Sequence, residues 1–165
     1  MHVLPMLLAS LLLTPNAAAS ASALHARVRP LSGIVRSILD DAVVRSPTID
    51  RLVRDLQQLD TIVYVDVAFG LDQSHGTTSI LTVSGTTRLL RVLINARLDP
   101  IRRFEILGHE LFHALEIARD PTVRDAASFR AFYTRHGYSV STTSFETDAA
   151  RAVEARVRTD LSRRR

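Results

Sequence analysis

Two histidines stand four residues apart in the middle of this 165-residue chain, and a glutamate directly follows the first of them. On a helix His109 and His113 are one turn apart, so both ring nitrogens can point at one metal ion. Glu110, about 100° further round the helix axis, can then reach a water molecule held by that ion. Zinc accepts neutral imidazole nitrogens at roughly 2.0–2.1 Å, and a catalytic zinc site keeps one position open. The three residues therefore predict a Zn2+ site with Glu110 as general base.

The segment around this motif carries the signals of a long helix. Asp99 and Pro100 supply an N-cap and a first helical residue, and Gly108 is the only weak helix former between residues 101 and 118. Apolar residues recur at three- and four-residue steps beside the histidine pair: Phe104, Leu107, Leu111, Leu115 and Ala118. We expect a helix over residues 101–118 that is buried along this stripe. The alternative is an amphipathic helix whose two histidines face solvent.

A zinc site of this kind needs a third protein ligand, and two glutamates are candidates. Glu116 shares the face of the histidines but lies about 4.5 Å further along the helix axis than His113. Its side chain leans back toward the site, yet a hydrogen bond to a ligand histidine, or pairing with an arginine, suits this position better. No glycine follows Ile117 to break the helix, so the third ligand is expected from another element. Glu146, near the start of a later predicted helix, is the best placed acid.

The remaining periodicities predict an α+β domain. Apolar residues at helical spacing indicate further helices at 30–44, 47–58, 123–135 and 145–161. Segments rich in β-branched residues indicate strands at 62–69, 79–83 and 88–95, the last two joined by a short turn containing Gly85. We expect a small antiparallel three-stranded sheet packed with about five helices, including the motif helix.

The first 23 residues have the pattern of a secretory signal peptide. An apolar run from Leu4 to Leu13 is too short to span a bilayer, and small residues of the A-x-A type follow it. No Lys or Arg precedes the run, so an uncleaved anchor or a mis-assigned start codon is the alternative. We expect a secreted or periplasmic protein with one domain at 24–165. The chain has no cysteine, so it forms no disulfide.

The charge pattern gives little support for a nucleic-acid partner. All 21 basic residues are arginine, and the net charge of +4 is modest. The arginines are scattered apart from residues 163–165, without interleaved aromatic residues or a recognition motif. A basic domain that binds an envelope surface or nucleic acid, with an incidental histidine pair, remains an alternative.

A sheet, an H-E-x-x-H helix and a later glutamate together resemble the zincin metallopeptidases of the gluzincin branch. About 100 residues, from the first strand to the last helix, resemble uncharacterised bacterial zincin-like proteins that carry H-E-L-x-H-A-x-E. The resemblance implies a peptide or protein substrate, with His109 and His113 as zinc ligands, Glu110 as general base and Glu146 as third ligand. One position departs from the thermolysin-like members, which carry an aspartate four residues after the ligand glutamate to orient a histidine. Ala150 stands there in this chain.

Peptide hydrolysis also needs a donor for the developing oxyanion. The available side chains are His75, His136, Tyr133 and Tyr138, and spacing singles out none of them. A zinc-binding module without catalysis is the other alternative for the site, although a purely structural site has no use for the base Glu110.

Overall fold

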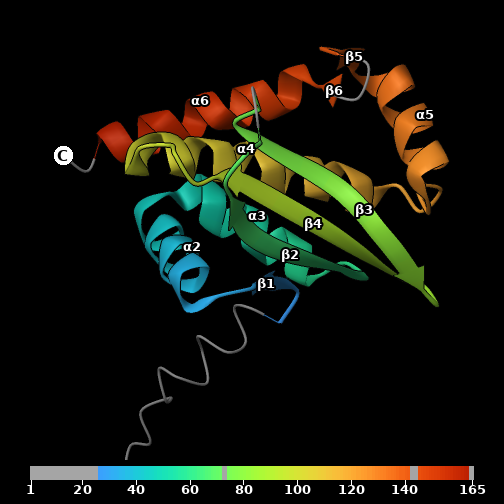
Figure 1. Ribbon diagram of the computed structural model, residues 1–165, viewed down its shortest axis with the longest axis horizontal. Helices are drawn as coiled ribbons and strands as arrows, with labels where there is room; N and C mark the ends of the chain where they lie inside the picture. The colour runs from blue at the N-terminus through green and yellow to red at the C-terminus, as the bar shows by residue number, and fades with distance from the viewer. Residues whose placement is uncertain (1–25, 72–73, 142–144, 164–165) are drawn as a thin grey trace, which may run out of the picture.

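A mixed four-stranded sheet carries its helices on one face (Figure 1). The computed structural model describes residues 26–71, 74–141 and 145–163. The strands of the sheet, in spatial order, are β1 (Val28–Pro30), β2 (Thr61–Ala68), β4 (Thr87–Asn95) and β3 (Gly76–Ser84). A second sheet pairs β5 (Tyr138–Ser139) with β6 (Phe145–Glu146).

Five helices complete the described part of the chain, and their bounds agree with the predicted ranges to within three residues. They are α2 (Gly33–Arg45), α3 (Pro47–Gln57), α4 (Pro100–Arg119), α5 (Ala126–His136) and α6 (Asp148–Ser162). The α+β class is confirmed. The export signal expected at residues 1–23 lies outside the described residues. Among the helices of the described segments, none combines the length and apolar character needed to cross a bilayer.

The predicted antiparallel three-stranded sheet is wrong. β2 runs parallel to β4, which lies between β2 and β3, and β1 adds a short parallel edge strand that the sequence reading missed. Within the described four-stranded sheet only the β3–β4 hairpin is antiparallel, and it turns at Gly85, whose φ of 60° suits glycine. β4 lies in the interior of the sheet, between β2 and β3, and its apolar residues Leu90 and Val92 are fully buried there. β3, which is rich in threonine and serine, remains at the edge.

The motif helix α4 lies between the sheet and α6 (Figure 1), and this position explains why it is buried nearly all round. Its five predicted core residues, Phe104, Leu107, Leu111, Leu115 and Ala118, are all buried. His109 and His113 are also buried, at 7% and 5% exposure, so the alternative with solvent-facing histidines is wrong.

Both ends of α4 are fixed by side chains. At the N-terminus the Asp99 carboxylate accepts hydrogen bonds from two backbone N–H groups, and Pro100 begins the helix, as predicted. At the C-terminus the buried Arg88 side chain of β4 donates to the carbonyls of Ile117 and Ala118, at 3.1 and 2.7 Å. These are among the carbonyls that a helix leaves unpaired at its end. The guanidinium thus ties the central strand to the motif helix.

The last helix begins later than predicted. Residues 145–146 form β6, and Thr147 is the N-cap, with its hydroxyl accepting from the backbone N–H of Ala150. Glu146 therefore stands two residues before α6 rather than within its first turn. A short strand pairing, rather than helix geometry, sets its direction.

We expect Gly108→Ala to destabilise the fold, because a β-carbon at Gly108 would lie 2.7 Å from the buried Val157 Cγ2 of α6. Overpacking of this kind costs about 1–3 kcal/mol of unfolding free energy, more than the roughly 1 kcal/mol by which helices favour alanine. Denaturant unfolding of Gly108→Ala, Val157→Ala and the double variant measures the coupling. In the Val157→Ala background the same substitution should cost little. A gain in stability from Gly108→Ala alone would contradict the close packing.

Candidate metal centre

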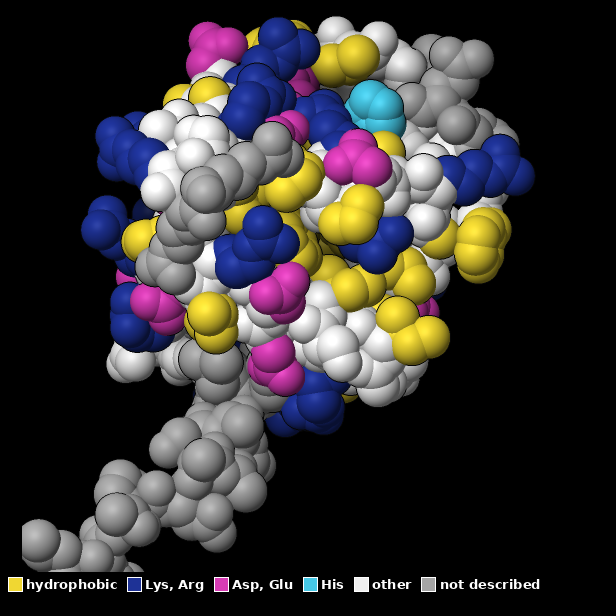
Figure 2. Space-filling model, turned by 90° about the vertical axis from the view of Figure 1, so that its left-hand side faces the viewer, with side chains coloured by type: hydrophobic (Ala, Val, Ile, Leu, Met, Phe, Trp, Pro, Cys, Tyr) yellow, Lys and Arg dark blue, Asp and Glu magenta, His cyan; other side chains and the backbone are white. Residues whose placement is uncertain are grey.

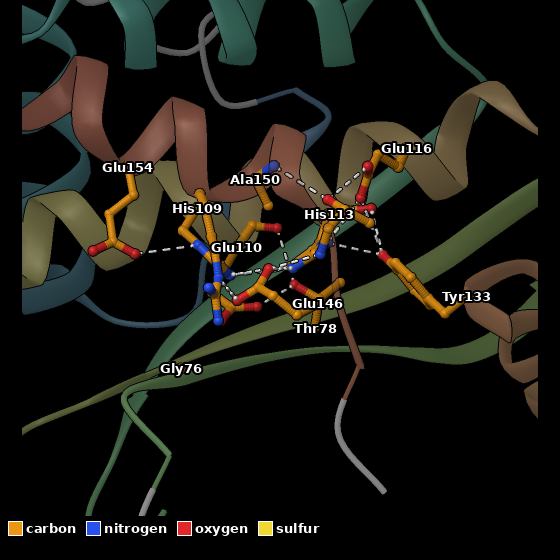
Figure 3. A network of polar contacts seen from close by, with 12 residues as sticks. Gly76, Thr78, His109, Glu110, His113, Glu116, Tyr133, Glu146, Ala150 and Glu154 are labelled. Carbon is orange, nitrogen blue, oxygen red and sulfur yellow. Dashed lines mark hydrogen bonds and ion pairs between the residues drawn. The ribbon is translucent and has the colours of Figure 1, made fainter. Parts of the chain in front are cut away.

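Three side chains from two separate segments meet at one point (Figure 3). The Nε2 atoms of His109 and His113 lie 3.1 Å apart. The Glu146 Oε1 atom lies 3.4 Å from each of these nitrogens. The structure thus brings together the three residues that the sequence singled out as ligands, and they form a group that could hold a metal ion.

The spacing of these donors fits a tetrahedral ion. Two ligands at 2.0–2.1 Å from a tetrahedral centre are about 3.3 Å apart, and the three observed separations of 3.1, 3.4 and 3.4 Å lie close to that value. Burying two imidazoles and a carboxylate this close together costs free energy, which a bound metal ion would offset. The donor set therefore fits a metal ion with one coordination position left for a further ligand.

Glu146 reaches the site because the backbone of β6 packs closely against Gly137, the residue that precedes β5. A β-carbon at Gly137, which precedes β5, would lie 2.4 Å from the Glu146 carbonyl oxygen, so only glycine permits this approach. The Tyr133 ring of α5 stacks on Phe145, with ring centroids 5.9 Å apart. The backbone N–H of Thr147 donates to Glu146 Oε1 at 2.8 Å. These contacts hold the Glu146 carboxylate next to the Nε2 atoms of His109 and His113.

Glu116 orients His113 and is not part of the ligand group. Its Oε2 atom lies 2.8 Å from His113 Nδ1, and its Oε1 atom accepts from the Thr147 hydroxyl at 3.0 Å. This is the hydrogen bond to a ligand histidine that the helix geometry favoured. The Tyr133 hydroxyl also lies 3.1 Å from His113 Nδ1. With Nδ1 occupied, the lone pair of Nε2 is free to face the metal position.

The general base predicted from the motif is held by the edge strand. The Thr78 hydroxyl of β3 donates to Glu110 Oε2 at 2.8 Å, and Glu110 is buried at 6% exposure. A β-carbon at Gly76 would lie 2.8 Å from Glu110 Oε1, so glycine allows β3 to pass this close to the carboxylate. Thr78 and Gly76 were not singled out by the sequence, because a strand-to-helix contact leaves no spacing signal.

A further glutamate that the sequence analysis missed stands beside the other ligand histidine. Glu154 Oε2 lies 3.3 Å from His109 Nδ1. It comes from α6, one helical turn beyond Ala150. The four-residue step from Ala150 to Glu154 was the available signal, since both positions lie on one face of a helix.

Three of the four side chains considered as oxyanion donors contact other side chains: Tyr133, His136 and Tyr138. Tyr133 contacts the far nitrogen of His113, as described above. The His136 ring packs against Phe132 at 4.7 Å, and the exposed Tyr138 ring lies under the guanidinium of Arg151. His75 precedes β3, where its carbonyl accepts from the backbone N–H of Asn95.

Burial and neighbouring groups shift the pKa values of the three polar motif residues. Burial raises the pKa of Glu110 to about 7, against the opposing effects of His113 and the Thr78 hydroxyl. Burial also lowers the pKa of His109, and the charge on His113 lowers it further. For His113 burial acts in the same downward direction, but hydrogen bonds to the carboxylates of Glu116 and Glu146 outweigh it and raise the pKa to about 9. The metal-free site therefore holds a proton on His113 at neutral pH.

No family model matches this chain, and neither the curated proteins nor the solved structures contain a match to it. The chemistry of the site is accordingly inferred from its own residues.

We expect metal binding at pH 7 to release about one proton per ion, because a ligand imidazole must be neutral and His113, with a pKa of about 9, is protonated there. Since the raised pKa makes the proton a competitor of the metal, affinity should rise with pH and level off above about 9. Calorimetric titrations in buffers of different ionisation enthalpy count the released protons. Glu116→Gln, which removes a carboxylate that raises this pKa, should release fewer. Affinity that does not change with pH would contradict this assignment.

Proposed function

We propose that this chain is a zinc-dependent peptidase of the zincin type, in its gluzincin branch, that hydrolyses peptide bonds with Glu110 as general base. The observation that carries the proposal is the convergence of His109 Nε2, His113 Nε2 and Glu146 Oε1 at separations of 3.1–3.4 Å. Two imidazoles and one carboxylate are the donor set of catalytic zinc sites with an open fourth position. The chain offers no thiolate that would instead favour a closed structural site.

The proposed mechanism divides the chemistry between the metal and Glu110. A zinc ion held by His109, His113 and Glu146 would supply Lewis acidity, which would lower the pKa of water to about 7 and polarise a peptide carbonyl. Glu110 accepts the proton of the attacking water and later passes it to the leaving amine. In the metal-free protein burial raises the pKa of Glu110 to about 7, toward the range that suits a carboxylate that must both take and return a proton. The Thr78 hydroxyl keeps this carboxylate in one orientation.

An extended peptide is the substrate that best suits the surroundings of Glu110. β3 is an edge strand in the described sheet, so one side of its backbone is not paired within that sheet. An extended segment can add to such an edge by main-chain hydrogen bonds. Gly76 and Thr78, which contact Glu110, belong to this same strand. A peptide paired with β3 would therefore run past the proposed base.

Two other functions have less support. A non-catalytic zinc module does not account for Glu110, which lies beside the ligand group and is held by Thr78. A basic nucleic-acid-binding domain would be expected to gather its arginines. On the face drawn in Figure 2, arginine side chains are instead interspersed with acidic and apolar ones. The activity is proposed to be periplasmic or extracellular, in line with the export signal expected at residues 1–23.

The first test is metal content. Purified protein should hold about one zinc ion per chain, and His113→Ala should lose it, because one imidazole and one carboxylate are too few ligands. Metal analysis of both proteins measures this, with His136→Ala as the matched control because that ring packs on Phe132 instead. Full zinc occupancy in His113→Ala would rule out the proposed site.

The second test separates the roles of three glutamates. Glu146→Gln should weaken zinc binding more than Glu116→Gln, since Glu146 contacts both ligand nitrogens whereas Glu116 contacts only the far nitrogen of His113. Loss of an orienting partner typically lowers metal affinity about 10–100-fold. Glu110→Gln should keep zinc and lose peptide hydrolysis, because it removes only the base.

Chelator competition on the three variants, together with hydrolysis of a mixed peptide library, distinguishes these outcomes. The ligand assignment is wrong if Glu146→Gln binds zinc like the wild type while Glu116→Gln does not. The catalytic assignment is wrong if Glu110→Gln hydrolyses peptides at the wild-type rate.

A further inference from the structure

The far nitrogen of His109 faces a carboxylate that the motif does not supply. His109 Nδ1 is buried and has no hydrogen bond of good geometry among the described residues, and the nearest acidic oxygen is Glu154 Oε2 at 3.3 Å. The Glu154 side chain is itself mostly buried, at 17% exposure. In Figure 3 it approaches His109 from α6, on the side away from His113.

Two arginines fix which oxygen of Glu154 faces the histidine. Arg102 of α4 and Arg158 of α6 both donate to Glu154 Oε1, the latter at 3.2 Å. The same two arginines also bind the buried Glu105, at distances of 2.7 to 3.0 Å. Oε1 of Glu154 is thereby occupied, and Oε2 is left as an acceptor directed at His109 Nδ1.

We propose that Glu154 is the positioning residue for His109, and that Arg102 and Arg158 hold it in this role. A carboxylate at Nδ1 favours the tautomer with hydrogen on that nitrogen and leaves the Nε2 lone pair for the metal. Glu154 thus orients a ligand histidine, a role that the methyl group of Ala150 cannot take. It stands one helical turn further along α6 than Ala150, and its side chain is longer than that of the aspartate in the thermolysin-like proteins. The proposal rests on the zinc site proposed above, but its effect on the His109 tautomer exists in the metal-free protein as well.

Glu154→Gln is the informative variant because it keeps the shape of the side chain. The two arginines require an oxygen at their position, so the amide nitrogen should take the place of Oε2 and donate toward His109 Nδ1. His109 should then shift to the tautomer with hydrogen on Nε2, the nitrogen that must bind the metal. Glu105→Gln is the matched control. It alters the same arginine network, because Glu105 binds Arg102 and Arg158, but the carboxylate beside His109 Nδ1 belongs to Glu154.

The experiment combines two readouts. Nitrogen-15 NMR of the metal-free protein, at a pH where His109 is neutral, reports its tautomer in the wild type, Glu154→Gln and Glu105→Gln. Competition with a chelator reports the zinc affinity of the same three proteins, and thermal unfolding checks that each is folded. We expect hydrogen on Nδ1 in the wild type and in Glu105→Gln, and on Nε2 in Glu154→Gln. Zinc affinity should fall about 10–100-fold in Glu154→Gln only.

Several results would overturn the inference. One is hydrogen on Nε2 in the wild type. Another is an equal loss of zinc affinity in Glu154→Gln and Glu105→Gln, which would assign the effect to the arginine network as a whole. A third is wild-type affinity in Glu154→Gln. If the wild type binds no zinc but the tautomer of His109 changes as expected between the wild type and Glu154→Gln, the proposed function is refuted and the role of Glu154 stands.

Discussion

Burying imidazoles and carboxylates in one place costs free energy unless each group finds a partner, and this constraint governs the structure around α4. The helix lies between the sheet and α6, so the two histidines and Glu110 are removed from solvent. Each then receives its partner from a different element. Glu116 of α4 serves His113, Glu154 of α6 lies beside His109, and Thr78 of β3 binds Glu110. The position of the neighbouring elements is therefore inseparable from the chemistry of the site.

The features that the sequence predicted are local ones. The helical spacing of His109 and His113, the N-cap at Asp99 and the role of Glu116 all depend on residues a few positions apart, where helix geometry alone sets the distances. Glu146 was predicted as third ligand from its place near the start of a later predicted helix, and it does join the histidines. The element predicted to hold Glu146 was wrong, since the residue lies in β6 and not in a helix. The two-residue strand pairing, which Gly137 makes possible, has no local sequence signal strong enough to compete with helix propensity.

Contacts between distant segments were not predictable in the same way. Glu154 faces His109 across the α4–α6 packing, which depends on the absence of a side chain at Gly108. Arg88 is a charged residue in the interior strand β4. Its burial is explained by its hydrogen bonds to the carbonyls at the C-terminal end of α4. In both cases the residue type was visible in the sequence, but its partner lay 29 or more positions away.

The error in sheet topology bears directly on the proposed function. An antiparallel three-stranded sheet of the predicted kind, if its strands were paired in sequence order, would place the strand at 79–83 between its two neighbours, with both sides of its backbone paired. In the observed order β4 takes the centre, and β3 becomes an antiparallel edge strand. The same insertion brings Gly76 and Thr78 against Glu110. One strand thus orients the proposed base and keeps an edge to which an extended chain can add. β4, with its buried apolar residues, occupies the interior of the sheet, and β3 therefore stands at the edge beside the site.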